Sequence, residues 1–355
     1  MEIITVGINH KTAPISIREK FYLNSIQQDL LLSDLKSDPS VVEAFVVSTC
    51  NRIEVYVRVI DKDYEPERIV MSICQIREIA YNSGLMGYFY VIINREAVEH
   101  LFRVITGLDS LVLGEKQILG QVKSAFEKSQ TKGFFGKHFN VLANVAVRTG
   151  KKAQHETDIS AGGSSISWAA IAKAEKYLGT LSDKSLLMIG AGTMSKLAVG
   201  QISNKGFKKL YLMNRTIEHA QALADTCSGE VVPFCDIKEI LSSVDLCICS
   251  SSAPHYILDT VTVEKVMELR GRRQLIFMDI SMPRNIDPKV ASIDNVVLYH
   301  IDDLESVVEE NLLKRQAAVQ EVEGIILNKL DEYYSKIGRL TSGEPVNLME
   351  PLDLL

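Results

Sequence analysis

One cysteine in the amino-terminal part of the chain stands where the sequence pattern would expose a thiol. Cys50 lies in the polar segment 48–52, Ser-Thr-Cys-Asn-Arg, between the apolar run 44–47 and a second strand-like run, 55–60. A turn between two strands would carry the thiol out of a sheet edge, with the guanidinium of Arg52 beside it. Exposure and a nearby cation favour the thiolate, the nucleophilic form of cysteine. Cys50 is therefore a candidate nucleophile, although most free cysteines are small buried hydrophobic residues.

A nucleotide-binding pattern lies in the middle of the chain. The apolar run 186–189 breaks into a glycine turn, and a helix is predicted to follow over 196–204. Glycines at such a turn allow a pyrophosphate to approach the helix N-terminus closely. Serine replaces the third glycine of the usual pattern, a change that the spacing tolerates. The cofactor-binding residues predicted at this turn are Gly190, Ala191, Gly192, Thr193, Met194 and Ser195.

The next predicted strand indicates which dinucleotide is bound. The run 209–213 ends in Asn214, Arg215 and Thr216, where an NAD enzyme usually has an acidic residue for the ribose hydroxyls. An acid would repel a 2′-phosphate whereas Arg215 would bind it, so NADPH is predicted rather than NADH. Further apolar runs, with helical segments between them, would complete a doubly wound sheet: 231–232, 246–250 and 275–280.

Composition limits the classes of function. The chain has 355 residues, of which 46% are hydrophobic and 24% charged, as in globular proteins of two or three domains. The formal net charge of −6 disfavours a general nucleic-acid binder. A local nucleic-acid-binding surface is still predicted over 121–155, because this segment contains seven basic residues and one acidic residue. The equally weighted alternative is that these residues form a solvated helical face.

The sequence also predicts the cellular location of the protein and whether it binds a metal. No apolar run approaches the roughly 18 residues of a membrane span, and the amino terminus lacks the basic start of a signal peptide. A cytoplasmic protein without a membrane partner is therefore expected. The six cysteines show no metal-ligand spacing with histidines, so no metal site is predicted.

The order of the elements predicts an α/β fold in four segments. Residues 1–155 would form an α/β catalytic domain that continues into helices, and 156–300 a Rossmann-type domain. A long helix is predicted over 301–338, because its apolar residues form a single stripe, and 339–355 would be a short tail. From about Asp302 to Ile337 this helix would be about 50 Å long, enough to run past more than one domain.

Three long motifs resemble the glutamyl-tRNA reductase family, NADPH enzymes that begin the C5 route to tetrapyrroles. They are residues 7–14, 48–52 with Glu54, and 107–123. The resemblance extends over nearly all of the chain to about Tyr333. It implies an amino-terminal domain that recognises glutamyl-tRNA, an NADPH domain, and a connecting carboxyl-terminal helix with the dimerisation domain apparently missing.

The resemblance also implies a mechanism. Cys50 would attack the activated carbonyl of glutamate esterified to tRNA and expel the tRNA, leaving a thioester that hydride from NADPH reduces to glutamate-1-semialdehyde. This is the first step of porphyrin and haem biosynthesis. His100 resembles the family histidine that activity requires, and would assist proton transfer. The residues implied to hold the glutamyl group are Thr49, Asn51, Arg52, Glu54, Ser110, Glu115, Lys116, Gln117 and Gln121. Arg52 suits its carboxylate, and Glu115 or Glu54 its ammonium.

The sequence departs from the family pattern in three places. Lys116 stands where the family usually has proline, and Gln154 where it usually has arginine. The sequence also stops soon after the long helix, where relatives continue into a helical dimerisation domain, so a monomer or another interface competes with the family's dimer. The partners implied are glutamyl-tRNA and the aminotransferase that takes the product.

Two other functions compete with this reading. One is an NADPH reductase of a small keto acid, which would need neither Cys50 nor tRNA. The other is a non-catalytic homologue that binds tRNA or regulates the pathway. The presence of Cys50, Arg52 and His100 together with the glycine turn counts against it.

Overall fold

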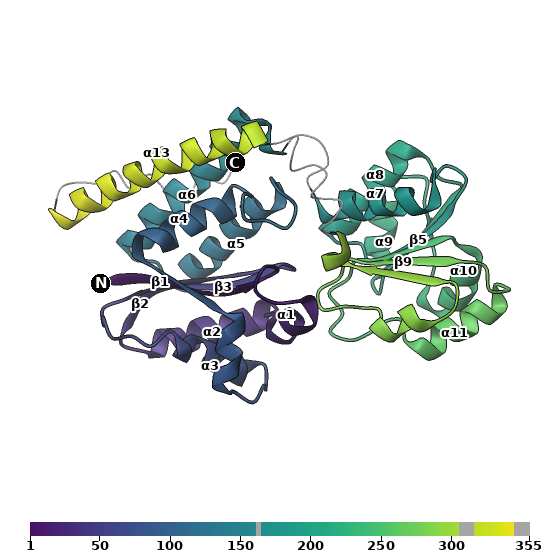
Figure 1. The fold of residues 1–355 in the computed structure, drawn as a ribbon, viewed down its shortest axis with the longest axis horizontal. Helices are drawn as coiled ribbons and strands as arrows, with labels where there is room; N and C mark the ends of the chain where they lie inside the picture. The colour runs from purple at the N-terminus through teal and green to yellow at the C-terminus, as the bar shows by residue number, and fades with distance from the viewer. Residues whose placement is uncertain (161–164, 305–315, 344–355) are drawn as a thin grey trace. The chain divides into compact units, whose positions relative to one another are not determined.

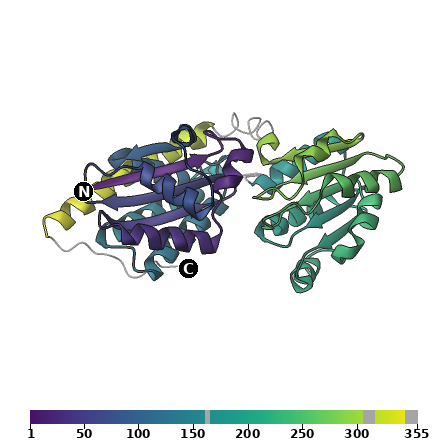
Figure 2. The same ribbon diagram turned by 90° about the horizontal axis from the view of Figure 1, so that it is seen from below.

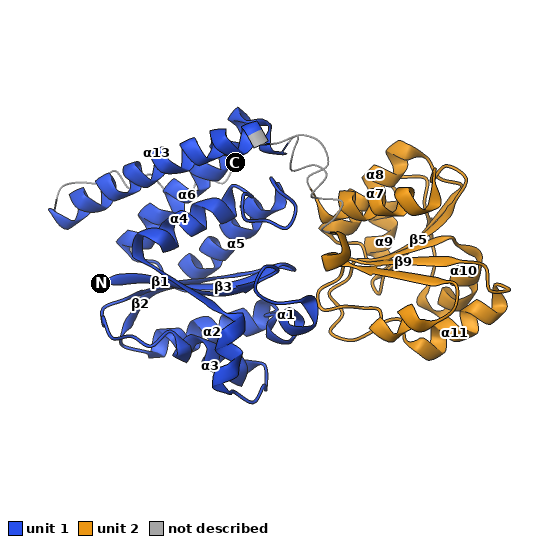
Figure 3. Cartoon of the chain, in the orientation of Figure 1, with its two compact units in different colours: residues 1–164, 311–355 blue, residues 165–310 orange. Residues whose placement is uncertain are grey.

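The computed structural model (Figure 1) describes residues 1–160, 165–304 and 316–343. The chain divides into two compact units, coloured separately in Figure 3: unit 1 comprises residues 1–164 and 311–355, and unit 2 comprises residues 165–310. The α/β class predicted from the sequence is confirmed in both. Within the described ranges, none of the helices combines the length and the apolar character needed to cross a membrane.

Unit 1 is built on a four-stranded antiparallel sheet in the order β2-β3-β1-β4. The strands are β1 (Glu2–Asn9), β2 (Val41–Ser48), β3 (Arg52–Val59) and β4 (Tyr90–Ile93). The two strands predicted on either side of Cys50 are thus confirmed as β2 and β3. They form a hairpin whose turn contains Cys50.

Helices cover both faces of this sheet (Figures 1 and 2). One face carries α1 (Ile15–Phe21), α2 (Ser25–Ser37) and α3 (Glu67–Ile76); the other carries α4 (Asn94–Ile105), α5 (Gln117–Thr131), α6 (Lys137–Glu156) and α13 (Gln316–Thr341). Alternation along β2 supplies both cores, because side chains of successive residues point to opposite faces. Phe45 and Val47 join the core with α4, α5 and α6, while Ala44 and Val46 join the core with α2 and α3.

The carboxyl-terminal helix belongs to unit 1. Its apolar stripe is buried against α4 and α6, as the sequence predicted: Val322, Ile326, Leu330 and Tyr333 are all at most 2% exposed. The predicted start of the helix is not observed, since residues 301–304 form a short 3₁₀-helix, η5. Residues 305–315 lie outside the described residues, so the helix over that part of the predicted range stays a prediction.

Unit 2 is a parallel six-stranded sheet in the order β10-β9-β8-β5-β6-β7, which confirms the doubly wound fold. The strands are β5 (Ser185–Ile189), β6 (Lys209–Met213), β7 (Glu230–Val231), β8 (Leu246–Cys249), β9 (Leu275–Asp279) and β10 (Val296–His300). The helices are α7 (Ile166–Leu178), α8 (Thr193–Lys205), α9 (Ile217–Ala224), α10 (Ile237–Ser243) and α11 (Thr260–Leu269). The sequence reading missed β10 because this edge strand buries only its first residue fully.

Candidate active site

Strand β3 places two ionisable side chains on the sheet face covered by α4, α5 and α6. Side chains two apart on a strand share a face, so Arg52 and Glu54 point the same way as Tyr56, which lies in the core beneath those helices. Arg52 is 1% exposed and Glu54 is fully buried. Because buried charges persist only when they are paired, both side chains need partners on this face.

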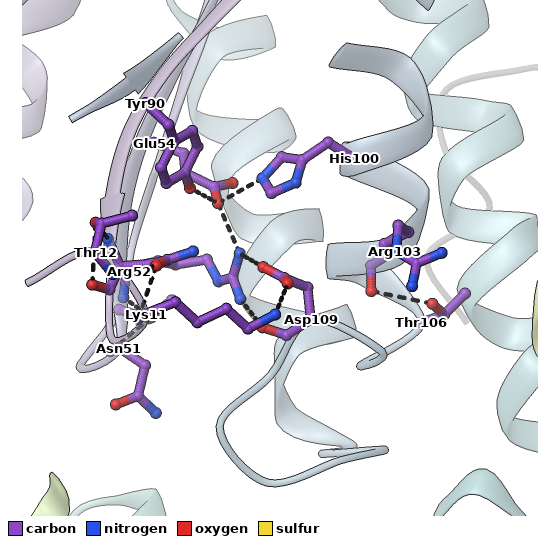
Figure 4. Close-up of polar contacts among 12 residues, drawn as sticks. Lys11, Thr12, Asn51, Arg52, Glu54, Tyr90, His100, Arg103, Thr106 and Asp109 are labelled. Atoms are coloured by element: carbon purple, nitrogen blue, oxygen red, sulfur yellow. Dashed lines mark hydrogen bonds and ion pairs between the residues drawn. The ribbon is translucent and has the colours of Figure 1, made fainter. Parts of the chain in front are cut away.

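Glu54 is the centre of a buried hydrogen-bond network (Figure 4). Its Oε1 accepts hydrogen bonds from Arg52 Nη1 at 2.6 Å and from the Tyr90 hydroxyl at 2.5 Å. The same oxygen lies 2.9 Å from His100 Nε2, and Oε2 accepts from the Tyr56 hydroxyl at 2.7 Å. Burial opposes ionisation of Glu54, but the charge of Arg52 and the bonds from His100 and Tyr90 hold its pKa well below the usual range. Glu54 is therefore a carboxylate that orients His100.

Tyr90 reaches Glu54 by passing over Gly7. In the sheet register Gly7 pairs with Glu54 on β3 and with Tyr90 on β4, so the three residues form one cross-strand row. A Cβ on Gly7 would lie 2.5 Å from the ring of Tyr90, so only glycine leaves room for this ring. The ring also packs edge-on against His100, with centroids 5.4 Å apart. The sequence analysis did not identify Tyr90, because the register of the strands, and not a local motif, brings Tyr90 to Glu54.

Asp109 completes the network from the loop after α4. Its Oδ2 accepts a hydrogen bond from Arg52 Nη1 at 3.0 Å, its main-chain oxygen accepts from Arg52 Nη2, and its Oδ1 pairs with Lys11 Nζ. Figure 4 shows Arg52 lying between Glu54 and Asp109. Arg52 is thus already shared between two carboxylates, an arrangement that the sequence did not predict.

Glycines fold the loop over 107–116 into this position. Gly107 and Gly114 both have positive φ, at 80° and 73°. A Cβ on Gly114 would lie 1.9 Å from the carbonyl oxygen of Ile159 in η2 (Asp158–Ser160), so no other residue fits there. Ser160 Oγ donates to the Gly114 carbonyl at 2.7 Å. The loop is therefore fixed at Gly114, where the absence of a side chain lets the backbone of η2 approach closely.

Three members of the network have the geometry of cation ligands. The ligand atoms of Glu54, His100 and Asp109 all lie within 4.8 Å of one another. Arg52 Nη1, however, already bonds both carboxylates and supplies the positive charge that a metal would bring. The group is therefore better described as an ion-pair network than as a metal centre.

Cys50 is half-buried, and its turn is tightly hydrogen-bonded. The main-chain nitrogen of Thr49 donates to the Arg52 carbonyl at 2.8 Å, and the nitrogens of Asn51 and Arg52 both donate to Thr49 Oγ1 at 3.2 Å. Burial, reinforced by the charge of Glu115, raises the pKa of the thiol to about 12. The predicted exposure is therefore wrong, and burial and Glu115 outweigh the nearby cations Arg18 and Arg52, so the structure favours the neutral thiol.

Glu115 is the second buried carboxyl group near Cys50. It is 7% exposed, and burial raises its pKa to about 7 against the opposing charge of Arg52. Its carboxyl group therefore changes charge near neutral pH. Deprotonation strengthens the negative potential that keeps the Cys50 thiol protonated.

We expect Glu115 to make unit 1 less stable as the pH rises. A folded-state pKa of about 7 exceeds the usual 4.5, so the folded state binds the proton more tightly, and stability falls as pH rises from about 4.5 to about 7. The loss should be on the order of 3 kcal/mol. Urea unfolding of the protein and of Glu115→Gln, compared at pH 5 and pH 8, should show a larger loss in the protein with Glu115 than in the variant. Equal pH dependence in both would contradict this assignment.

The other predicted substrate residues surround this region without joining the network. Thr49 and Asn51 are buried in the Cys50 turn, Ser110 is half-buried in the loop, and Lys116 and Gln121 are exposed. Gln117 differs, because its side-chain Nε2 is buried and has no hydrogen-bond partner among the described residues. Buried donors of this kind are usually paired with protein, with ordered water or with a ligand, so this group is available to a ligand.

The two substitutions that depart from the family pattern lie side by side. Gln154 Nε2 donates to the main-chain oxygen of Lys116 at 3.3 Å. Lys116 has an exposed side chain next to the loop, and Gln154 holds its backbone from α6. The two changes therefore act on the same point of the loop.

Most of the basic residues between 121 and 155 are ion-paired. Lys128 and Lys132 pair with Asp29 of α2, while Arg148 pairs with Glu332 of α13. Lys152 pairs with Glu156 one turn further along α6. These pairs neutralise much of the predicted nucleic-acid-binding surface and favour its alternative, a solvated helical face.

The dinucleotide turn of unit 2 has the geometry that its glycines predicted. Gly190 has φ of 106°, and a Cβ there would lie 2.1 Å from the Ser250 carbonyl oxygen. A Cβ on Gly192, directly before α8, would meet nothing within 4 Å, so space is open at this helix N-terminus. Ser195, in place of the third glycine, is buried and donates through Oγ to the Ser250 carbonyl at 3.3 Å.

The residues after β6 border the same end of the parallel sheet. Asn214 Nδ2 donates to the Thr216 carbonyl at 2.8 Å and closes the turn. Arg215, between them, is exposed. The guanidinium of Arg215 is therefore at the carboxyl end of β6, next to β5, the strand that leads into the glycine turn.

Comparison with known proteins identifies the two halves of the chain. Residues 6–157 match the model for the glutamyl-tRNA reductase N-terminal domain, and residues 172–307 match that for shikimate/quinate 5-dehydrogenase. The chain is 38% identical to glutamyl-tRNA reductase from Thermodesulfovibrio yellowstonii, across 96% of this chain and 81% of that protein. The chain belongs to the glutamyl-tRNA reductase family.

Further members of the glutamyl-tRNA reductase family agree with this assignment. The enzyme from Priestia megaterium is 40% identical, across 96% of this chain and 76% of that protein. Among solved structures, glutamyl-tRNA reductase from Methanopyrus kandleri superposes with a TM-score of 0.52 at 31% identity, covering 95% of this chain and 81% of that one. The similarity therefore includes both units.

Proposed function

We propose that this protein reduces glutamyl-tRNA with NADPH to glutamate-1-semialdehyde through a thioester on Cys50. The observation that carries the proposal is the continuity between the Cys50 turn and the buried network: Arg52, two residues after the cysteine, bonds the carboxylate that also holds His100. The nucleophile thus lies in the turn directly before β3, the guanidinium at the start of β3, and the histidine on α4 over the sheet.

The thiolate of Cys50 would attack the glutamyl carbonyl carbon, so that the C–S bond forms as the ester C–O bond breaks. The tRNA hydroxyl leaves with a proton. NADPH, when bound, supplies the hydride that reduces the thioester carbonyl to a hemithioacetal, and breaking the C–S bond then releases the aldehyde and restores the thiol. Each of these steps requires a proton to be moved near Cys50.

His100 is suited to move that proton. Because Glu54 is ionised, His100 Nε2 carries the hydrogen that points to it, which leaves Nδ1 with a lone pair. A histidine held in one tautomer by a carboxylate is a common arrangement for general acid–base catalysis. We assign His100 to accept and return the proton.

Arg52, Glu115 and Gln117 are proposed to hold the glutamyl group. The three bonds from Arg52 to Glu54 and Asp109 use three of its five N–H groups, so donors remain for a substrate carboxylate. Glu115 would pair with the ammonium group, which would cancel the negative charge that keeps Cys50 protonated. The unpartnered Nε2 of Gln117 would donate to a substrate oxygen.

The residues of the glycine turn fit a dinucleotide phosphate. The open space before α8 would admit a pyrophosphate to the helix N-terminus between Gly190 and Thr193. Arg215 would bind the 2′-phosphate, with Asn214 and Thr216 shaping its turn. Ala191, Met194 and Ser195 complete the proposed cofactor-binding segment.

We expect Arg215→Gln to weaken NADPH binding about tenfold, since a charge-assisted bond to the 2′-phosphate would be lost. NADH lacks this phosphate, so its KM should change less than twofold. Arg272→Gln, an exposed arginine before the amino end of β9, is the matched control and should leave both values unchanged. Equal losses for NADPH and NADH would contradict the assigned contact.

The test of the function is turnover. Oxidation of NADPH should require charged glutamyl-tRNA, and uncharged tRNA or free glutamate should not replace it. Reduction of a small keto acid at a comparable rate would favour the alternative reductase. Binding of tRNA without turnover would favour a non-catalytic homologue.

The aldehyde product is reactive, so we propose that glutamate-1-semialdehyde aminotransferase takes it directly. Both aminoacyl-tRNA and NADPH are available in the cytoplasm, where we place the protein. Coupled turnover with the aminotransferase should proceed without free aldehyde accumulating. Accumulation equal to that of the uncoupled reaction would exclude direct transfer.

A further inference from the structure

Two loops of unit 2 are hydrogen-bonded to each other where they leave the parallel sheet. The β8 loop, residues 250–259, follows β8, and the β9 loop, residues 280–287, follows β9. The main-chain nitrogen of Leu258 donates to the Asn285 carbonyl at 3.1 Å, and that of Asp287 donates to the Leu258 carbonyl at 2.9 Å. The backbones of the two loops therefore run together at the carboxyl end of the sheet.

Asp279, the last residue of β9, holds the β9 loop from within. Its side chain is fully buried. Oδ1 accepts a hydrogen bond from the main-chain nitrogen of Ser281 at 3.1 Å. Oδ2 accepts from the nitrogens of Asn285 and Ile286 at 2.8 and 2.9 Å. Both oxygens of one carboxyl group thus bind the start and the end of the same loop.

Asn285 and Ser251 connect the two loops through their side chains. Asn285 is fully buried, and its Nδ2 donates to the Ala253 carbonyl at 3.0 Å, while its Oδ1 accepts from Ser251 Oγ. The main-chain nitrogen of Ser251 donates to Ser281 Oγ at 3.2 Å. The carboxyl group that fixes the β9 loop therefore also fixes the β8 loop, through the residues that join them.

The two loops lie on one side of the point where the strand order reverses. From this point β5, β6 and β7 follow in one direction, and β8, β9 and β10 in the other. A doubly wound sheet binds a dinucleotide across such a point, between its two mononucleotide-binding halves. Arg215, after β6, is assigned to the 2′-phosphate of the adenosine half, which leaves β8 and β9 for the nicotinamide half.

We propose that Asp279 is a positioning residue for the nicotinamide half of NADPH: it fixes the β9 loop and, through Asn285 and Ser251, the β8 loop in the shape that receives this half. The inference rests on the proposed NADPH site and extends it to the other end of the cofactor. Loops that are already ordered lose less conformational freedom when a ligand binds, so the bonds to Asp279 should add to affinity without contact between this residue and the cofactor.

Asp279→Asn tests the role of the carboxyl group with almost no change in size. An amide has one acceptor oxygen and one NH₂ donor, whereas the carboxylate accepts through both oxygens. Whichever way the amide turns, its NH₂ group faces at least one main-chain N–H of the β9 loop. That N–H loses its partner, and a buried donor without a partner is costly, so the loop should move away from its present position.

The measurement is isothermal titration calorimetry of the full chain with two ligands: NADPH, and adenosine 2′,5′-bisphosphate, which has the adenosine half and the 2′-phosphate but no nicotinamide. Asp279→Asn should weaken binding of NADPH about tenfold and binding of the bisphosphate less than twofold. Arg215→Gln should weaken binding of both ligands about tenfold, since both carry the 2′-phosphate.

Two serine variants provide a milder test and its matched control. Ser251→Ala removes the side-chain bond to Asn285 and should weaken NADPH binding about threefold, with the bisphosphate unchanged. Ser242 is also a half-buried serine of unit 2, bonded through Oγ to the Glu239 carbonyl at 2.7 Å, but it lies at the end of α10, before the amino end of β8. Ser242→Ala should bind both ligands as the original protein does.

The other outcomes would overturn the proposal. They are original NADPH affinity in a folded Asp279→Asn protein, equal losses for NADPH and the bisphosphate, and a loss in Ser242→Ala as large as that in Ser251→Ala. The fluorescence of Trp168 in α7 reports whether unit 2 is folded, and should Asp279→Asn fail to fold, Ser251→Ala decides alone. Because binding needs neither tRNA nor Cys50, a failure of the proposed reductase function would be seen separately, in turnover.

Discussion

Replacing Cys50 with serine is expected to abolish reduction of glutamyl-tRNA, with kcat falling at least ~10³-fold. Serine keeps the size of the side chain and the hydrogen bonds of the turn, so glutamyl-tRNA and NADPH should still bind. A hydroxyl is far less acidic than a thiol and is a weak nucleophile without an adjacent base. The measurement is NADPH oxidation with purified, charged tRNA.

A second cysteine gives the matched control. Cys235 is exposed, free and in unit 2, so Cys235→Ser should retain the original kcat. Acid quenching during turnover should trap a glutamyl adduct on the Cys50 peptide of the original protein and none on the serine variant. Undiminished reduction by Cys50→Ser would reject the thioester route.

The dinucleotide turn could be predicted from the sequence because its physical requirements are local. Gly190 needs a positive φ and close approach to the Ser250 carbonyl, and no other residue type meets both demands. The strand before it and the helix after it are contiguous in the chain. A short segment therefore contains nearly all of the information that its geometry requires.

The network around Glu54 could be predicted only in part, because it depends on strand register. Arg52 and Glu54 were identified by resemblance to a family, but Tyr90 and Lys11 were not placed in the site. Tyr90 meets Glu54 only because β1 puts Gly7 between them, across 36 residues of sequence. No periodicity within one segment specifies such a pairing.

The environment of Cys50 was predicted wrongly for the same reason. A polar turn between two apolar runs indicates exposure, and this would hold for an isolated hairpin. Here Arg18 from α1 and Glu115 from the glycine loop fold against the turn, and the residue becomes half-buried. The tertiary contacts, rather than the hairpin, determine the acidity of the thiol.

Arg52→Met is expected to destabilise unit 1 by about 3–5 kcal/mol and to remove activity. The variant leaves Glu54 buried without its cation, and Asp109 loses its bonds from the same guanidinium. A buried carboxylate without a partner either keeps a costly charge or takes up a proton, and a protonated Glu54 would no longer fix the tautomer of His100. Both stability and catalysis therefore depend on one side chain.

The two effects can be separated by a double variant. In Arg52→Met/Glu54→Leu the uncompensated charge is gone, so most of the lost stability should return, because apolar replacements of buried ion pairs are often close to neutral. Activity should stay absent, since neither the guanidinium nor the carboxylate that orients His100 is present. Recovery of activity together with stability would show that the pair is structural only.

Unit 2 provides an internal control for this measurement. Trp168 in α7 is the chain's single tryptophan, so its fluorescence follows unfolding of unit 2, while circular dichroism follows both units. Arg52→Met should lower the urea midpoint of the circular dichroism transition that unit 1 contributes and leave the tryptophan transition in place. Because a chain of two units need not unfold in one step, the two signals have to be fitted separately. An equal shift in both signals would mean that the pair of Arg52 and Glu54 stabilises the whole chain rather than unit 1 alone.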